Sequence, residues 1–289
     1  DMSSVVQQLV SGLAMGFIYC MTATEYTLIY NTSSLMNFGH DKYIMCGAYI
    51  FAGTFMLALK TNSLIGVIGT LLLMAGLGVL IATVGFNPIK NIPTIHAVTC
   101  TLALSMIVRE IVRLYYGAAA FTVNGFLRGT YQFGAITIPR TYVVIIVLSI
   151  ILLVLQQLLL KKTMLGTAML AVSQDKEAAA LMGINVSMIL VVTTAFSLII
   201  CGLIGVLIIP LYGCNLTMTA TLGTKGFVAG IIGGLGNLNG AIAGGLCLGL
   251  IEVMFLILGG PGIYKDFVSF VVIIVFLLFR PQGILRNQS

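Results

Sequence analysis

The run KKTMLGTAMLAVSQDKEAAALMGIN, residues 161–185, is a polar island between two strongly apolar stretches. YVVIIVLSIILLVLQQLLL precedes it at 142–160, and VSMILVVTTAFSLIICGLIGVLII follows it at 186–209. About 20 consecutive apolar residues are enough to span the hydrocarbon core of a bilayer as a helix. The sequence therefore predicts two membrane-spanning helices that are joined by a short polar connection.

The same pattern extends over the whole chain, which is 59% hydrophobic, only 8% charged and has a mean hydropathy of +1.12. Nine apolar segments can be marked out: 5–30, 42–59, 64–86, 94–116, 142–160, 186–209, 217–236, 240–258 and 264–280. The seventh is weak because it carries Lys225, and we expect it to be a short or re-entrant helix. We therefore predict an all-α, polytopic transmembrane bundle of eight to nine helices. It forms one polytopic membrane domain over residues 1–289.

The formal charge of +6 does not indicate a nucleic-acid partner, because the Lys and Arg residues are scattered singly and form no basic stripe. They are also divided almost evenly between the two sides of the predicted membrane, so charge alone does not set the orientation. Nine crossings and a cytoplasmic C-terminus would place the N-terminus outside, whereas one re-entrant segment would place it inside.

Glycine is dense from residue 226 to residue 249 and recurs there every four residues. Gly226, Gly230 and Gly234 form one such series, and the pairs Gly240–Gly244 and Gly245–Gly249 follow. Small residues at this spacing let helices approach closely in lipid. The region therefore predicts tightly packed helices with a break near Asn237.

The polar island is rich in Ala, Met, Leu, Lys and Glu, all of which favour helix formation. A polar helix between two spans is a natural binding surface for a soluble partner. Within it, Ala178 and Ala179 predict a flat side that allows close approach, and Gly183 follows. Asp175 and Glu177 would add polar contacts. The alternative is a plain solvated loop helix.

The sequence EAAALMG (177–183) resembles the E-A-A-x-x-x-G coupling motif of ABC importer permeases, whose cytoplasmic helix docks into a groove of the ATPase subunit. Four longer stretches resemble one family of such proteins, the LivH/LivM-type branched-chain amino-acid permeases. They are SLMNFGHDKYIMCGAYI (34–50), AVSQDKEAAALMGINV (171–186), TKGFVAGIIGGLGNLNGAIAGG (224–245) and YKDFVSFVVIIVFLLFRPQGIL (264–285). The resemblance covers nearly the whole chain, and its length is closer to that of LivH.

Two departures from the family pattern stand out. The family usually has Asn-Phe-Ala-His-Gly where this chain has Asn-Phe-Gly-His-Asp at 37–41, and Glu25 stands where a small residue is more usual. Both changes lie near the substrate pathway that the resemblance implies.

The resemblance implies a second permease subunit (as a homodimer or a heterodimer), two ATPase subunits that bind ATP, and an extracytoplasmic substrate-binding protein. It also implies leucine, isoleucine or valine as cargo, and a permease domain located in the cell inner (plasma) membrane. We assign ATPase coupling to the island residues Asp175, Glu177, Ala178, Ala179 and Gly183.

Candidates for the substrate pathway are Asn37, Phe38, His40 and Glu25. Ionisable groups within spans are costly and are therefore functional candidates, which also singles out Glu252. Asn37 and His40 are three residues apart and would line a cavity where helix ends meet. The positive ends of helices would favour a ligand carboxylate there. A packing role for His40 is the alternative.

No catalytic constellation, metal-binding motif or ATP-binding G-x-x-x-x-G-K-[ST] loop occurs in the sequence. We therefore expect a transport subunit without its own cofactor, with ATP hydrolysis on partner chains. The rival interpretations are a ribose-type ABC sugar permease, a secondary amino-acid transporter and, more distantly, an intramembrane enzyme.

Overall fold

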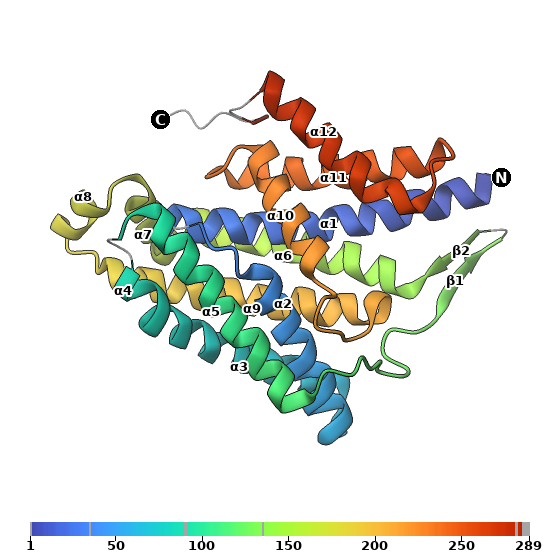
Figure 1. Cartoon of the computed structure of the whole chain (residues 1–289), viewed down its shortest axis with the longest axis horizontal. Helices are drawn as coiled ribbons and strands as arrows, with labels where there is room; N and C mark the ends of the chain where they lie inside the picture. The colour runs from blue at the N-terminus through green and yellow to red at the C-terminus, as the bar shows by residue number, and fades with distance from the viewer. Residues whose placement is uncertain (1, 35, 90–91, 135, 281–282, 285–289) are drawn as a thin grey trace. The chain divides into compact units, whose positions relative to one another are not determined.

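The computed structural model describes residues 2–34, 36–89, 92–134, 136–280 and 283–284, and these residues are almost entirely helical (Figure 1). The long helices are α1 (Met2–Ser33), α3 (Ser63–Leu80), α5 (Thr94–Tyr116), α6 (Arg140–Lys162), α9 (Val186–Tyr212), α11 (Leu238–Ile257) and α12 (Lys265–Phe279). The shorter ones are α2 (His40–Tyr49), α4 (Asn87–Ile89), α7 (Met164–Gln174), α8 (Lys176–Leu181) and α10 (Ala220–Gly233). Two π-helices, η1 (Ile50–Ala58) and η2 (Ile81–Phe86), and a 3₁₀ turn, η3 (Gly262–Tyr264), complete the helical elements.

The prediction of a polytopic helical bundle is confirmed, with a small difference in the helix count. Seven helices in the described chain are long and apolar enough to cross a membrane, against the eight to nine expected. The other two predicted segments form shorter helices: 42–59 becomes α2 followed by η1, and 217–236 becomes the 14-residue α10. α10 begins late because the Asn215 side chain accepts a hydrogen bond from the backbone N–H of Thr217 (3.0 Å) and holds a turn.

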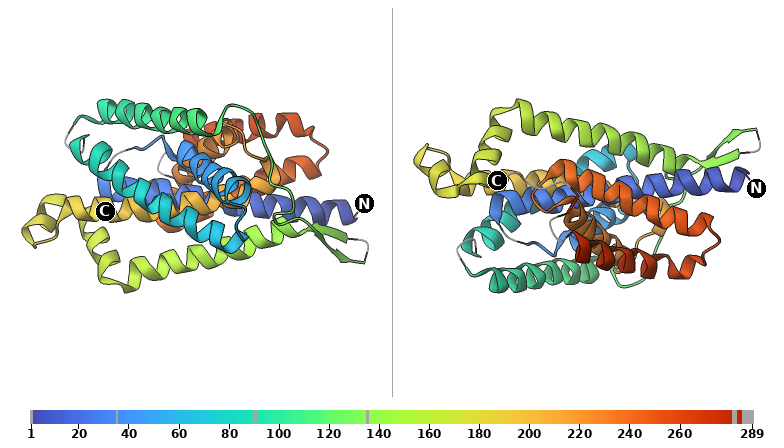
Figure 2. Two further views of the ribbon diagram at one scale, coloured as in Figure 1. Left: turned by 90° about the horizontal axis from the view of Figure 1, so that it is seen from below. Right: turned by 90° about the horizontal axis from the view of Figure 1, so that it is seen from above.

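The region 117–140 contains a small β-hairpin. Strand β1 (Thr130–Phe133) pairs antiparallel with β2 (Ile136–Pro139), and Tyr131 lies opposite Ile138. Both views in Figure 2 show the hairpin continuing beyond the start of α6, beside the first turns of α1. The Gln7 side chain of α1 donates a hydrogen bond to the backbone oxygen of Thr137 (2.7 Å).

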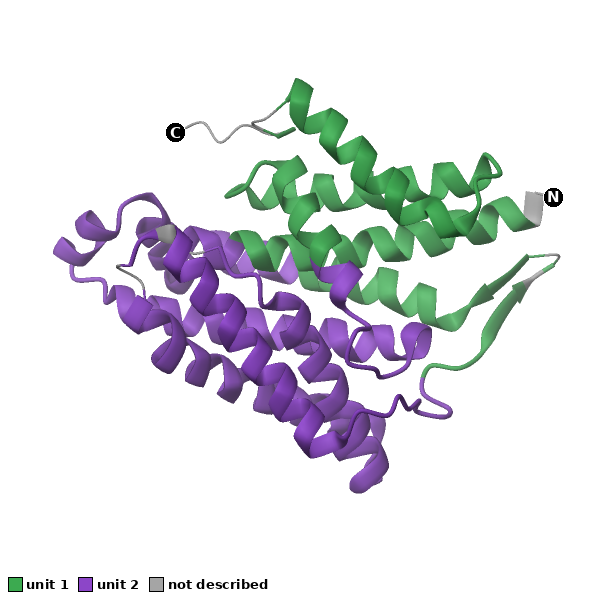
Figure 3. Cartoon of the chain, in the orientation of Figure 1, with its two compact units in different colours: residues 1–27, 127–153, 224–289 green, residues 28–126, 154–223 purple. Residues whose placement is uncertain are grey.

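The chain divides into two compact units, each of which has its own packing (Figure 3). Unit 1 comprises Asp1–Thr27, Leu127–Leu153 and Thr224–Ser289, and unit 2 comprises Leu28–Phe126 and Val154–Gly223. Helices α1, α6 and α10 contribute residues to both units. The expectation of a single permease domain over residues 1–289 stays a prediction.

Glycines bring the helices of unit 1 together, as their spacing predicts. A Cβ on Gly249 of α11 would lie 2.5 Å from the Cα of Gly16 on α1, and one on Gly245 would lie 2.5 Å from the backbone N of Cys20. Gly233 and Gly240 lie against each other across the break between α10 and α11. Any side chain at these positions would force the helices apart, so the glycines set the helix spacing.

Helix α9 is the centre of unit 2. In its most apolar stretch of 18 residues, 72% of the residues are buried, whereas 11% are buried in residues 262–279 of unit 1, which contain α12. A Cβ on Gly47 of α2 would lie 2.5 Å from the Cα of Gly202, and one on Gly78 of α3 would lie 2.6 Å from the Cα of Ala195. Small residues on α9 therefore seat α2 and α3 directly against its backbone.

Contacts within each unit also give the helix directions. α11 runs antiparallel to α1, because its later residue Gly249 meets Gly16 and its earlier residue Gly245 meets Cys20. After α12, residues 283–284 lie at the end of α10, where the backbone N–H of Ile284 donates to the oxygen of Ile232 (2.7 Å).

Candidate functional site

The described residues just before α2, 34 and 36–39, are not helical. α1 ends at Ser33, and Ser34 takes a left-handed conformation (φ 58°) that is uncommon for a residue other than glycine. Further on, the Asn37 side-chain oxygen accepts a hydrogen bond from the backbone N–H of Gly39 (2.9 Å). The hydroxyl of Thr101 on α5 donates to the backbone oxygen of Met36 (3.3 Å). Side chains therefore hold this segment out of the helical conformation.

The first turn of α2 lies deep inside unit 2. His40 is completely buried, and its Nδ1 lies 3.6 Å from the Sγ of Cys201, near the middle of α9. Irregular backbone at membrane depth is tolerated only where protein buries it or where it lines a cavity. The start of α2 is therefore a position where a polar ligand can meet backbone and side-chain groups inside an apolar bundle.

Gly39 is surrounded by polar side chains at this point. A Cβ on Gly39 would lie 2.8 Å from the Cβ of Ser105 and 3.0 Å from both the Asn37 Oδ1 and the Tyr43 hydroxyl. The departure from alanine to glycine at position 39 thus has a steric reason in this chain. The Asn37 amide and the Tyr43 hydroxyl are both buried here and lie beside each other, where the amide can donate to the hydroxyl oxygen.

Asp41, where the family usually has glycine, packs against the start of α10. The Thr219 hydroxyl donates to the backbone oxygen of Asp41 (2.6 Å), and Gly223 leaves room for the Asp41 side chain. The Asp41 carboxylate also forms an ion pair with the adjacent Lys42. Asp41 therefore links the first turns of two short helices.

The predicted pathway residues fall in both units. Asn37, Phe38 and His40 lie at the start of α2 in unit 2, where Asn37 and His40 are buried and Phe38 is half-buried. Glu25 is completely buried in α1 and belongs to unit 1.

Sequence reasoning missed further polar groups near this point. Thr193 and Ser197 share a face of α9 with Cys201, since each is separated by four residues from the next. Both are fully buried, and their hydroxyls lack a hydrogen-bond partner among the residues that the structure describes. The signal available in the sequence was this i, i+4 spacing of polar residues within an apolar span.

The predicted coupling residues form a short helix with complete caps. The Asp175 carboxylate accepts hydrogen bonds from the backbone N–H groups of Glu177 (2.9 Å) and Ala178 (3.0 Å), which makes it the N-cap of α8. At the other end Gly183 is left-handed (φ 86°), and its N–H donates to the oxygen of Ala180 (3.0 Å). The N–H of Ile184 donates to the oxygen of Ala179 (3.0 Å), which completes a Schellman motif.

This geometry changes the interpretation of two coupling residues. Ala179 does not share an outer face with Ala178; it is buried in a small cluster with Met169, Val172 and Ile189. Gly183 has no atom within 4 Å of the position that a Cβ would take. Its local role is therefore to supply the left-handed C-cap.

The outward side of α8 is apolar. Leu181 and Met182 are 89% and 83% exposed, and Ala178 and Glu177 are exposed beside them. Asp175 is exposed apart from its capping bonds. Leu181 and Met182 lie three and four residues after Ala178, on neighbouring positions of the helix surface. Large, exposed apolar side chains at this spacing form the kind of helix face that docks into a groove of a partner.

A lysine of α8 reaches back to α1. The Lys176 ammonium donates a hydrogen bond to the backbone oxygen of Ser33 (2.5 Å), across 143 positions in the sequence. Nothing in the sequence indicated this pairing.

Unit 1 contains a cluster of charges buried among its helices. Lys225 of α10 forms an ion pair with Glu252 of α11, and both side chains are almost fully buried. Lys225 also contacts Asp266 at the start of α12 (2.5 Å), and Lys265 contacts Glu252 (3.3 Å). Two positive and two negative side chains therefore balance one another.

Hydroxyl groups complete the environment of Glu252. The Tyr19 hydroxyl of α1 and the Ser269 hydroxyl of α12 donate to its two carboxylate oxygens (3.1 and 3.0 Å). Four helices thus meet at one carboxylate, as is typical of polar networks that fix helix positions. Glu252, a functional candidate by sequence, is an acceptor within this network.

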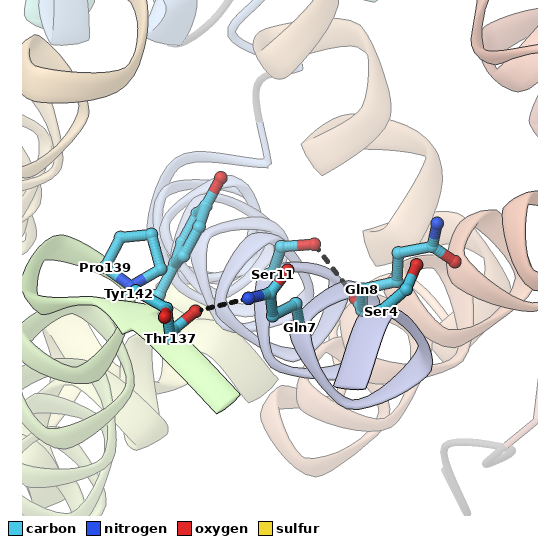
Figure 4. Close-up of a pocket in the computed structure, with 7 residues that line it drawn as sticks. All are labelled: Ser4, Gln7, Gln8, Ser11, Thr137, Pro139 and Tyr142. Atoms are coloured by element: carbon cyan, nitrogen blue, oxygen red, sulfur yellow. Dashed lines mark hydrogen bonds between the residues drawn. The ribbon is translucent and has the colours of Figure 1, made fainter. Parts of the chain in front are cut away.

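A polar pocket of about 410 Å³ lies between the start of α1 and the hairpin (Figure 4). Its lining residues are Ser4, Gln7, Gln8, Ser11, Thr137, Pro139 and Tyr142. The Gln7–Thr137 hydrogen bond closes one side of it.

Comparison with known proteins accounts for the combination of apolar helices and the capped helix α8. Residues 8–277 match the family described as the permease component of the branched-chain amino acid transport system. This chain belongs to that family. Its membership and its seven spans make it a multi-pass protein of the inner membrane and a transport subunit.

Named relatives are similar over almost their full length. The chain is 28% identical to the high-affinity branched-chain amino acid permease protein LivH of Escherichia coli K12, over 98% of this chain and 96% of the relative. It is 29% identical to BraD of Pseudomonas aeruginosa over the same shares. The probable LivH of Methanocaldococcus jannaschii is 25% identical over 91% of this chain and 87% of the relative.

A solved structure has a similar fold. PsaBC from Streptococcus pneumoniae, in complex with a Fab, superposes with a TM-score of 0.52 and 14% identity. The superposition covers 97% of this chain and 92% of that chain.

Proposed function

We propose that this permease carries leucine, isoleucine and valine across the inner membrane as part of an ATP-driven importer. The observation that carries the proposal is the capped helix α8 with its exposed apolar face, in a chain that matches the permease family over residues 8–277. Relatives at 28–29% identity are named as branched-chain amino acid permeases, which favours this cargo over a sugar.

Helix α8 is the proposed docking site of an ATPase subunit. Leu181 and Met182 project from a capped helix that is anchored by Ala179, so the partner meets a preformed surface. Exposed apolar side chains of this size favour burial in a partner groove. The chain has no ATP-binding loop of its own, so the proposal places ATP hydrolysis on two partner subunits. A second permease subunit and a substrate-binding protein complete the proposed assembly.

The start of α2 is the proposed substrate contact. Helix N-termini favour anionic groups, and the buried Asn37 amide is an additional hydrogen-bond donor at this point. An amino-acid carboxylate would satisfy both. The half-buried Phe38 is an apolar neighbour for the cargo side chain, and His40 braces the turn against Cys201.

The proposed orientation follows from the two ends of α1. Its first turns bind the hairpin through Gln7, and its last residue binds α8 through Lys176. If α8 is cytoplasmic, the N-terminus, the hairpin and the polar pocket are extracytoplasmic. The antiparallel course of α11 and the place of residues 283–284 at the end of α10 favour a cytoplasmic C-terminus.

Reconstitution tests the proposal directly. The permease is placed in proteoliposomes with its partner permease, the two ATPases and the binding protein, and uptake of labelled leucine and ribose is measured with and without ATP. We expect leucine uptake that requires ATP and is competed by isoleucine and valine. Uptake that persists without the ATPases but collapses with the ion gradient would instead support a secondary transporter.

A further inference from the structure

Lys176 makes a contact that the stability of its own helix does not explain. It is the first residue of α8, directly after the Asp175 N-cap. A positive charge is unfavourable at a helix N-terminus, where the acidic Glu177 next to it is favourable. A half-buried lysine at this position therefore calls for another role.

The Lys176 side chain satisfies the end of a different helix. The last carbonyl groups of a helix have no partner within that helix, and the buried Ser33 oxygen at the end of α1 is one of them. The Lys176 ammonium donates to this oxygen at 2.5 Å. Charge-assisted bonds of this kind are stronger than neutral ones, and cations are favoured at helix C-termini.

The bonded carbonyl belongs to the turn that leads to the proposed substrate contact. Ser34, the next residue, is left-handed at φ 58° and donates its N–H to the oxygen of Tyr30 (2.8 Å). A non-glycine residue in this conformation is strained and persists only where surrounding contacts impose it. Three residues further on, Asn37 begins the approach to α2.

Helix α8 is built to move as one body. Both of its ends are capped, and Ala179 anchors it in the cluster with Met169, Val172 and Ile189. A displacement of α8 by a partner would therefore act on α7 and α9 through this cluster, and on the end of α1 through Lys176.

We propose that Lys176 is a positioning residue that transmits movement of the coupling helix to the turn at Ser33 and Ser34, and from there to the start of α2. The inference rests on the proposed function. It adds a route from the ATPase contact to the substrate contact that includes the Lys176–Ser33 hydrogen bond between α8 and α1.

The test compares three variants in the reconstituted complex. Lys176→Met keeps an apolar stem and removes the donor, and Lys176→Arg keeps a donor. Lys162→Met, which removes an exposed lysine of the same island, is the matched control. ATPase co-purification, ATP hydrolysis and leucine uptake are measured on the same preparations.

We expect Lys176→Met to retain ATPase binding and ATP hydrolysis within about twofold, while leucine taken up per ATP hydrolysed falls about tenfold or more. Lys176→Arg should recover most of this ratio, and Lys162→Met should leave it unchanged. An unchanged ratio in Lys176→Met would overturn the inference. So would a parallel loss of ATPase binding and uptake, because it would indicate a purely structural role.

A second variant separates transmission from stabilisation of the turn. Glycine adopts the left-handed conformation at position 34 without strain. We expect Ser34→Gly to leave Lys176→Met uncoupled. Restored coupling in the double variant would mean that Lys176 only holds the turn, and would refute the inference. Absence of ATP-dependent uptake in the unsubstituted complex would refute the proposed function itself.

Discussion

Replacement of Lys225 by methionine tests the buried ion network of unit 1. The substitution keeps a side chain of similar length and removes one charge, so the balanced cluster of four charges acquires a net charge of −1. Removing one partner of a buried ion pair costs about 3–5 kcal/mol, because the other charge stays buried without it.

The structure places the expected loss at the lower end of this range. Glu252 retains Lys265 at 3.3 Å, the Tyr19 hydroxyl at 3.1 Å and the Ser269 hydroxyl at 3.0 Å. Asp266 also loses a partner, but its side chain is 50% exposed and is therefore solvated. We expect a loss of about 3 kcal/mol in the free energy of unfolding, which is roughly 150-fold in the folding equilibrium.

The double variant Lys225→Met/Glu252→Gln restores the charge balance. The glutamine oxygen still accepts a hydrogen bond from Tyr19 or Ser269, and no buried charge is left alone. We expect the double variant to lie within about 1 kcal/mol of the unsubstituted protein, since neutral replacement of a buried pair is often tolerated. The coupling energy between the two sites is then about 2 kcal/mol or more.

The assay is reversible denaturation in mixed micelles of the unsubstituted protein, both single variants and the double variant. Arg113→Met is the matched control, because the Arg113–Glu110 pair on α5 is about half exposed and should contribute under about 1 kcal/mol. If the double variant loses as much as the two single variants added together, the charges do not stabilise each other and the reasoning is refuted.

Three further predictions follow from the other sites. Gly183→Ala should lower the stability of α8 by about 1–2 kcal/mol, because alanine is strained at φ 86°. The variant should therefore co-purify less ATPase. Normal ATPase binding and normal uptake would show that the cap is unimportant. Asn37→Ala and His40→Ala should each impair leucine uptake while the complex still assembles, and full uptake by the double variant would make both packing residues. An impermeant thiol reagent applied to intact cells should label Gln132→Cys in the hairpin but not Gln174→Cys beside α8, and the reverse result would contradict the orientation.

The sequence by itself determined where the helices lie and which segment is polar. The predicted segment 94–116 is α5, and 186–209 is α9 without its last turn. The glycine spacing from 226 to 249 correctly predicted close helix contacts, because small residues at intervals of four line one helix face. The coupling motif was also recognisable, since Asp175 and Gly183 are helix caps that act within a few residues.

Only the tertiary structure decided which helices meet and which side chains face each other. The pairing of Lys176 with Ser33, the four helices around Glu252 and the inward position of Ala179 all join residues distant in sequence. In a soluble protein the apolar face of a helix indicates which side packs against the rest of the fold. Here lipid is as apolar as the protein interior, so hydrophobic periodicity does not distinguish the two sides of a span. Close packing and the few buried polar groups made that choice, and both depend on contacts in three dimensions.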